Sequence, residues 1–181
     1  MLTIIEKRIL DTLLSGGIII YPTDTIYGIG CDAFNSKAVE KVFIIKNRKL
    51  ENPVSLLYPN IDSIQENFYV ENIDLKKYVG AYTLLLKPKN WIEKVDSKCF
   101  YKDGYVGVRI IPHWISKVVE ELGNPIISTS ANVSGSKLVP YNMSNIDIEI
   151  IEKIDSVVYE GHLQTSASKV INPYTGSILR G

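Results

Sequence analysis

Short apolar runs recur along the whole chain and alternate with segments that have the periodicity of amphipathic helices. Runs such as GGIII, PVSLLY, YTLLL, YVGVRII, PIIS, SVVYE, SKVIN and SILR have the length and composition of buried strands. The helical segments lie between several of these runs, without a strict strand–helix–strand repeat. The pattern therefore predicts an α/β domain built on a mixed sheet.

Capping and breaking residues mark the expected helices. We expect a first helix over 5–14, a second helix that begins at a capping Ser36, and a third helix over 113–122 that Gly123 ends. Shorter helices are expected over 61–68, 72–80 and 145–154.

The composition limits the classes of partner. The chain has 181 residues, of which 45% are hydrophobic, and this is enough for one domain with a sizeable core. Lys and Arg (20) balance Asp and Glu (20), so no overall charge attracts nucleic acid or a membrane. No apolar run approaches the roughly 20 residues that span a bilayer. Cys31 and Cys99 lie far apart without a CxxC spacing, which indicates two buried thiols in a cytoplasmic protein.

Polar side chains gather where the apolar runs end. The stretch YPTDTIYGIG, residues 21–30, leaves the first strand with hydroxyls, an acid and two glycines. Ligands of open α/β sheets bind in crevices at strand ends, so these ends are expected to meet at one pocket. Guanidinium groups suit carboxylate and phosphate, and the sequence therefore predicts an anion-binding pocket. The side chains concerned are Thr23, Asp24, Thr25, Lys46, Arg48, Asn52, Arg109, Ser128, Thr129, Ser130, Asn132, Ser168, Lys169 and Arg180.

Each of these residues also has a purely structural interpretation. Hydroxyls such as Thr25 could bond only their own loops. Lys46 and Arg48 could compensate the carboxyl end of a helix. Asp24 is interpreted as a turn or capping residue in preference to a metal ligand. Residues 28–33, GIGCDA, fit a dinucleotide fingerprint but begin several residues after their strand, so we do not expect dinucleotide binding.

Six motifs occur together in the order and approximate spacing of a known family: YPTDTIYGIG, KNR…NP, VGVR, STSANVSG, SKV and ILRG. From about Gly16 to its last residue, the chain resembles the YrdC-like family of threonylcarbamoyl-AMP synthases, in the single-domain, TsaC-type form. The resemblance implies a twisted mixed sheet with flanking helices around a deep, positively charged cavity. It also implies one catalytic domain over 1–181, without the additional C-terminal domain of longer members.

The resemblance further implies a nucleotidyltransferase, an L-threonylcarbamoyladenylate synthase. Such an enzyme converts L-threonine, bicarbonate and ATP into threonylcarbamoyl-AMP and pyrophosphate. The product would pass to a complex that transfers the threonylcarbamoyl group to tRNA, and weak RNA binding is a further expected property. Mg²⁺ is expected to arrive with ATP, and no metal site of the protein itself is implied.

Family roles carry over to matching positions of this sequence. The positions implied for L-threonine are Thr25, Arg109, Ser128 and Ser168, with Arg109 opposite the carboxylate. The positions implied for ATP are Lys46, Arg48, Asn52, Ser130, Asn132 and Arg180, with Lys46 and Arg48 as the catalytic cations. Gly28 and Gly30 are expected to let the backbone pass close to the ligand. The chain departs from the family pattern at Lys49 and Lys169, at GAYT, and at Leu57 or Tyr58, where many members have a histidine.

Two other classes of function stay open. A non-catalytic module could bind double-stranded RNA or a nucleotide through phosphate contacts and shape, although the zero net charge argues against it. Carbamoyl transfer, as in the related hydrogenase-maturation domains, would not depend on threonine. No residue is indicated as a general base.

Overall fold

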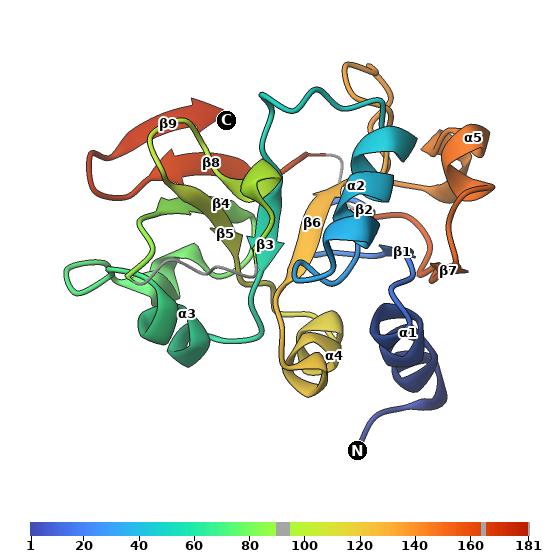
Figure 1. The fold of residues 1–181 in the computed structure, drawn as a ribbon, viewed down its shortest axis with the longest axis horizontal. Coiled ribbons are helices and arrows are strands. Elements are labelled where there is room, and N and C mark those ends of the chain that lie inside the picture. Colours follow the sequence, from blue (N-terminus) through green and yellow to red (C-terminus); the bar gives the residue numbers. More distant parts are fainter. Residues whose placement is uncertain (90–94, 164–165, 181) are drawn as a thin grey trace.

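The computed structural model describes residues 1–89, 95–163 and 166–180, except for the side chain of Arg180. Strands and helices alternate irregularly along it (Figure 1). The α-helices are α1 (Ile4–Leu14), α2 (Ser36–Ile45), α3 (Ile61–Asn67), α4 (Ile115–Leu122) and α5 (Ile148–Ile151), and the 3-10 helices are η1 (Leu75–Tyr78), η2 (Ser97–Cys99) and η3 (Met143–Asn145). The strands are β1 (Ile19–Tyr21), β2 (Gly28–Gly30), β3 (Ser55–Leu57), β4 (Tyr82–Leu86), β5 (Val106–Arg109), β6 (Ile126–Ser130), β7 (Ser156–Val157), β8 (Lys169–Asn172) and β9 (Ser177–Arg180).

The strands within these described residues form one twisted, mixed sheet. Their order is β7-β1-β2-β6-β3-β5-β4-β8-β9. The β1–β7, β3–β5 and β4–β8 pairs are parallel, and the other neighbouring pairs are antiparallel. The predicted α/β fold with a mixed sheet and flanking helices is therefore confirmed.

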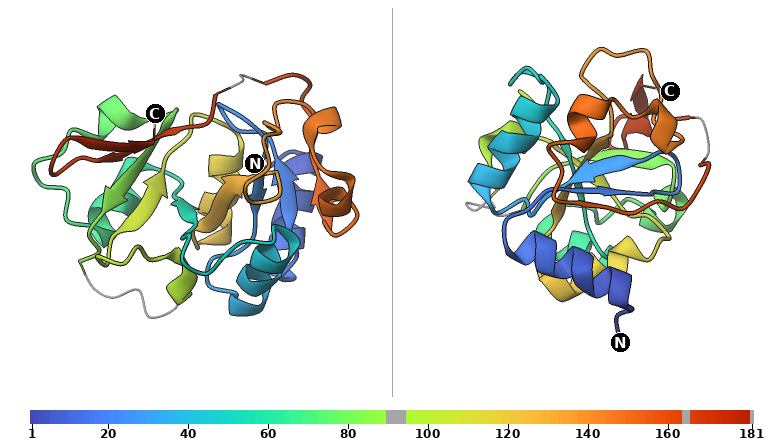
Figure 2. Two further views of the ribbon diagram at one scale, coloured as in Figure 1. Left: turned by 90° about the horizontal axis from the view of Figure 1, so that it is seen from above. Right: turned by 90° about the vertical axis from the view of Figure 1, so that its right-hand side faces the viewer.

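Alternating side chains of the strands build a core on each face of the sheet. Ile20 of β1 packs in the cluster that contains the buried face of α2, whereas Ile19 and Tyr21 pack in the cluster under α1 and α4. This alternation is the two-residue period of a strand buried on both faces. α1 and α4 lie side by side on one face, and α2 lies on the other (Figures 1 and 2).

Local capping explains where the helices begin and end. Thr3 and Glu6 form a capping box at the start of α1, and Gly123 ends α4 with a positive φ of 75°. The predicted cap of α2 was wrong by one residue, because the side chain of Asn35, not of Ser36, accepts from Ala38 N. The helices expected over 72–80 and 145–154 are shorter in the structure: the first range contains only η1, and the second contains α5, with η3 just before it.

The main correction to the predicted fold concerns residues 28–30. The sequence predicts a loop for GIG, but these residues form β2, which pairs antiparallel with β1 and with β6. Glycine has a low strand propensity, which hides such a strand in the sequence. A Cβ at Gly30 would lie 2.8 Å from Tyr21 Cε1 and 2.8 Å from Ile127 O. The close contact that the glycine allows is therefore with the neighbouring strands.

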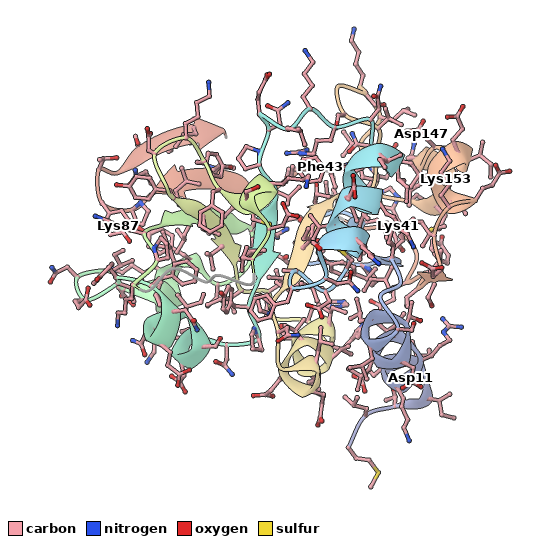
Figure 3. All side chains as sticks on the ribbon, viewed as in Figure 1. Asp11, Lys41, Phe43, Lys87, Asp147 and Lys153 are labelled. Atoms are coloured by element: carbon pink, nitrogen blue, oxygen red, sulfur yellow. The ribbon has the colours of Figure 1, made fainter. Side chains whose placement is uncertain are left out.

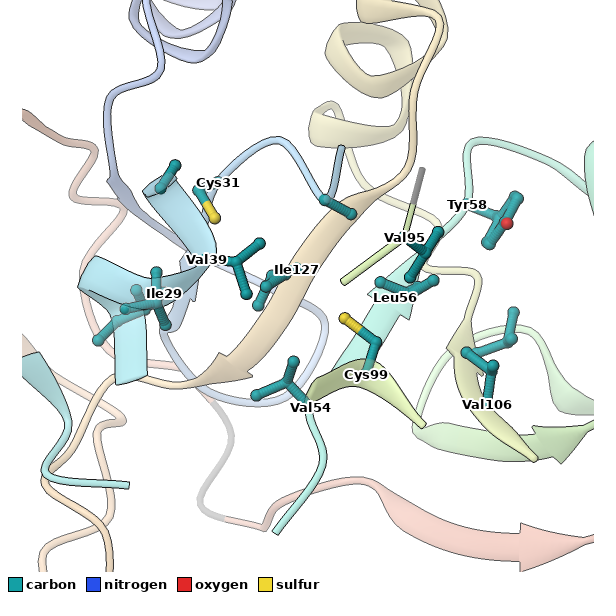
Figure 4. Packing of buried hydrophobic residues seen from close by; sticks show 14 of the residues in the cluster. Ile29, Cys31, Val39, Val54, Leu56, Tyr58, Val95, Cys99, Val106 and Ile127 are labelled. Carbon is teal, nitrogen blue, oxygen red and sulfur yellow. The ribbon is translucent and has the colours of Figure 1, made fainter. Parts of the chain in front are cut away.

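Both cysteines are free and buried, as predicted. Cys31 and Cys99 lie among apolar side chains of the core that includes Val39, Leu56 and Ile127 (Figure 4). Burial raises the pKa of both thiols, to about 12 for Cys99. In the described part of the chain, no helix is long and apolar enough to cross a membrane.

Candidate functional site

A cavity opens where the loop after β1 meets the ends of β5 and β6. It has a volume of about 110 Å³. All four residues that the sequence predicted around threonine line it, namely Thr25, Arg109, Ser128 and Ser168. We call this space the first cavity. Its other lining residues include Thr23, Gly28, Arg48, Thr83, Tyr101 and Ser130.

Arg109 brings a positive charge to the wall of the first cavity. It is the last residue of β5 and is 7% exposed. Its Nη2 donates to Asp24 Oδ1 at 2.8 Å and lies 3.5 Å from both Thr25 Oγ1 and Gly80 O. Asp24 is thus the ion-pair partner of Arg109, which corrects its interpretation as a turn or capping residue. The pair fixes the orientation of a guanidinium that can bind a carboxylate.

Hydroxyl groups cover much of the remaining wall, and hydrogen bonds order them. Thr23 Oγ1 and Thr25 Oγ1 lie 3.0 Å apart, and Thr83 Oγ1 and Ser168 Oγ lie 2.9 Å apart. Thr25, Thr83 and Ser168 are all buried. The wall therefore offers fixed donors and acceptors beside the guanidinium of Arg109, which suits a small polar anion.

A second cavity adjoins the first. It has a volume of about 290 Å³. Five of the residues predicted around ATP line it, namely Lys46, Arg48, Asn52, Ser130 and Asn132. The sixth, Arg180, has a side chain outside the described residues. The residues that line both cavities are Arg48, Pro53, Tyr101 and Ser130.

Lys46 follows α2 and is only 1% exposed. Its Nζ donates to Ser130 O and, at 2.5 Å, to Asn132 O. Burial lowers the pKa of this amine to about 7, and the nearby Arg48 adds to the effect. The negative charge of Asp147, at the start of α5 (Figure 3), acts in the opposite direction. Lys46 therefore ties α2 to the loop after β6 as well as lining the second cavity.

Arg48 lies at the boundary between the two cavities. Its Nε donates to Asn52 O and its Nη2 to Pro53 O, both at 2.7 Å. The chain turns sharply just before it, since Asn47 has a φ of 47°. These contacts hold the guanidinium over the junction.

The loop after β6 completes the second cavity. Ser130 Oγ donates to Asn132 Oδ1 at 2.6 Å, and Asn132 Nδ2 donates to Leu138 O at 3.2 Å. Ser134 also lines this cavity, and its buried Oγ has no hydrogen-bond partner among the described residues. A buried hydroxyl without a partner is uncommon.

The sequence did not single out several of the lining residues, among them Thr83, Tyr101 and Ser134. Thr83 lies in the apolar run YTLLL and was read only as strand. Tyr101 lies in a segment without a clear periodicity, so nothing in the sequence placed it. Ser134 belongs to the STSANVSG motif, whose hydroxyls were a usable signal.

Known proteins share this sequence pattern and this fold. A family model named for Sua5, YciO and YrdC, and described as telomere recombination, matches residues 11–181. The chain belongs to the Sua5/YciO/YrdC family. The resemblance seen in the sequence motifs is thereby confirmed.

Members of the Sua5/YciO/YrdC family match most of this chain. A Methanocaldococcus jannaschii protein, whose name proposes it as a threonylcarbamoyl-AMP synthase, is 35% identical over 175 residues, which cover 92% of this chain and 80% of that protein. The structure of P. abyssi Sua5 complexed with L-threonine has a TM-score of 0.80 and 25% identity, and it covers 92% of this chain. This chain spans 50% of that Sua5 chain. Escherichia coli YciO, at 23% identity, shares the fold with a TM-score of 0.82 over 97% of this chain and 87% of its own.

Proposed function

We propose that this chain is an L-threonylcarbamoyladenylate synthase, which makes threonylcarbamoyl-AMP and pyrophosphate from L-threonine, bicarbonate and ATP. The observation that carries the proposal is the junction of the two cavities at Arg48, Pro53, Tyr101 and Ser130. One cavity suits a small anion with hydroxyl contacts, and the other gathers the cations and amides expected around phosphates. Two substrates placed there would meet at Arg48.

L-Threonine would occupy the first cavity. Arg109 would bind its carboxylate, with Thr25, Ser128 and Ser168 supplying hydroxyl contacts around the rest of the molecule. The related P. abyssi Sua5, which has been solved with L-threonine, supports this choice of amino acid. The structure places Leu57 and Tyr58 in the apolar core, so the hydroxyl wall would have to replace the contact that a histidine makes in other members.

ATP would occupy the second cavity. Lys46, Arg48 and Arg180 are the cations proposed for the phosphates, and Asn52, Ser130 and Asn132 are the proposed polar contacts. Mg²⁺ would neutralise part of the phosphate charge when it is bound with ATP. We propose that the phosphates carry it into the second cavity.

The reaction then needs mainly positioning and charge compensation. The amine nitrogen of threonine bonds to the carbon of bicarbonate-derived CO₂ and loses a proton, which gives a carbamate. A carbamate oxygen then bonds to the α-phosphorus of ATP, and pyrophosphate leaves. Two unit charges about 4 Å apart repel by roughly 4 kcal/mol at an effective dielectric constant of about 20. A cation at the junction offsets this repulsion, and this is the role that we propose for Arg48.

The product would be a reactive mixed anhydride that is consumed by a second enzyme. We propose that it passes to the complex that attaches the threonylcarbamoyl group to tRNA. Weak RNA binding would serve this transfer and is part of the same proposal.

Pyrophosphate release from the purified protein tests the proposed function. We expect release only when L-threonine, bicarbonate, ATP and Mg²⁺ are all present, and omission of any one of them should abolish it. Release without a dependence on threonine would favour carbamoyl transfer. No release, together with RNA binding that weakens steeply with salt, would favour the non-catalytic module.

A further inference from the structure

A buried tyrosine donates a hydrogen bond to one of the proposed threonine-binding residues. Tyr21, the last residue of β1, is fully buried, and its phenol donates to Ser128 Oγ at 2.9 Å. Ser128 lines the first cavity, whereas Tyr21 is not among the residues that line it. Burial raises the pKa of Tyr21 to about 12, so the phenol keeps its proton at neutral pH. In the structure the hydrogen bond runs from Tyr21 to Ser128.

The sheet is built so that the Tyr21 ring can make this contact. β2 lies between β1 and β6, and Gly28 pairs with Tyr21 on one side and with Ser130 on the other. Neighbouring strands lie about 4.8 Å apart, so a side chain of β1 must cross β2 to reach β6. A Cβ at Gly28 would lie 3.2 Å from Tyr21 Cζ, and one at Gly30 would lie 2.8 Å from Tyr21 Cε1. The two glycines thus leave the path of the ring open.

The direction of this bond decides what Ser128 can offer to a ligand. A serine hydroxyl has one proton and two acceptor sites. The Tyr21 proton occupies one acceptor site, and hydrogen bonds in a chain polarise one another. The proton of Ser128 is left for a different partner, and Ser128 lines the first cavity, where a bound ligand can supply one. An anionic oxygen of the substrate accepts such a proton well.

We propose that Tyr21 is a positioning residue, which orients Ser128 Oγ as a hydrogen-bond donor toward an anionic oxygen of the amino acid in the first cavity. This inference rests on the proposed function for the identity of that amino acid. It adds a role for the tyrosine and for the two glycines of YPTDTIYGIG. It also gives a reason for the position of the Tyr21 ring, which lies across β2 at the two glycines.

Tyr21→Phe tests the proposal, because it removes the hydroxyl and keeps the ring. L-Threonine affinity is measured by calorimetry, and the KM values for threonine and ATP are measured by pyrophosphate release. We expect Tyr21→Phe to weaken threonine binding about fivefold, which is the typical effect of one lost hydrogen bond, and to leave the ATP KM within about twofold. Tyr174→Phe is the matched control, since its hydroxyl bonds Lys87 N and Tyr69 O away from both cavities.

A double variant separates positioning from a general structural role. If Tyr21 acts through Ser128, Tyr21→Phe has no further effect on threonine affinity in a Ser128→Ala background. Equal effects of Tyr21→Phe in both backgrounds, or an unchanged threonine affinity in the single variant, overturn the proposal. So does a parallel rise of the threonine and ATP KM values, which indicates a general loss of structure.

The wild-type protein tests the proposed function separately. Threonine binding without pyrophosphate release would refute the proposed synthase activity. The role of Tyr21 would then be decided by the calorimetric comparison of the wild-type protein with Tyr21→Phe. Failure of the wild-type protein to bind threonine would refute the positioning role as well.

Discussion

The buried amine of Lys46 predicts an unusual dependence of stability on pH. Lys46 Nζ lies among backbone carbonyls in a site that is only 1% exposed, and its pKa falls from 10.5 to about 7. The unfolded chain holds this proton up to about pH 10.5, whereas the folded chain releases it near pH 7. Unfolding therefore takes up a proton between these two pH values. The free energy of unfolding accordingly rises as the pH rises through this window.

The size of the effect follows from the shift in pKa. Each unit corresponds to about 1.4 kcal/mol, so the charged amine costs the folded state about 5 kcal/mol below pH 7. Between pH 7 and 9.5 the folded state recovers about 3 kcal/mol of this cost. Lys46→Met removes the titrating group, and the recovery should disappear with it. The variant also leaves Ser130 O and Asn132 O without this donor, a loss that does not depend on pH.

Urea unfolding of the wild-type protein and of Lys46→Met at several pH values from 7 to 9.5 measures this difference. We expect the free energy of unfolding of the wild-type protein, relative to that of Lys46→Met, to increase by about 3 kcal/mol from pH 7 to pH 9.5. Lys41→Met is the control, because Lys41 lies exposed on α2, the helix that Lys46 follows (Figure 3). This variant should keep the wild-type dependence of the free energy of unfolding on pH. Parallel pH profiles for the wild-type protein and Lys46→Met would refute the reasoning.

Three other substitutions test the site and its supporting strands. Arg48→Ala should abolish pyrophosphate release in a folded protein, because it removes the cation at the junction of the cavities. Arg109→Lys should raise the threonine KM more than tenfold and leave the ATP KM unchanged, because an ammonium group cannot reproduce a planar guanidinium. Gly30→Ala should lower the free energy of unfolding by about 1–3 kcal/mol, because its Cβ would lie 2.8 Å from Tyr21 Cε1.

The same assays supply the controls and the contrary outcomes. Lys49→Ala changes an exposed cation next to Arg48 and should retain turnover. Normal turnover of Arg48→Ala would refute the proposed role of Arg48 as the cation at the junction of the two cavities. A threonine KM that Arg109→Lys leaves unchanged would place the carboxylate elsewhere, and a Gly30→Ala protein as stable as the wild type would show that the strands can separate at no cost.

The sequence predicted those parts of the fold that depend on local periodicity. The extent of α1, the glycine that ends α4 and the five residues of β4 all follow from spacing and breakers. β2 was missed because its two glycines are explained by contacts with the neighbouring strands, namely with Tyr21 of β1 and Ile127 of β6. Such contacts leave no trace in the local sequence, since they depend on how β1 and β6 pair on either side of β2.

The placement of the site residues was easier to anticipate than their partners. Polar residues at strand ends were expected to meet, and the structure brings Thr25, Arg109 and Ser128 to one cavity. The ion pair of Arg109 with Asp24 was not foreseen, nor was the burial of Lys46 against two carbonyls. Each depends on exact distances between segments that are far apart in the sequence. The contacts of Lys46 indicate that its removal would also affect folding.

A crystal structure of the protein with L-threonine and a non-hydrolysable ATP analogue would test the central claim most directly. We predict that the threonine carboxylate lies at Arg109 in the first cavity and that the α-phosphate lies beside Arg48, close enough for a carbamate to bridge the two ligands. Ligands bound at separate places, with neither of them touching Arg48 or Ser130, would contradict the account.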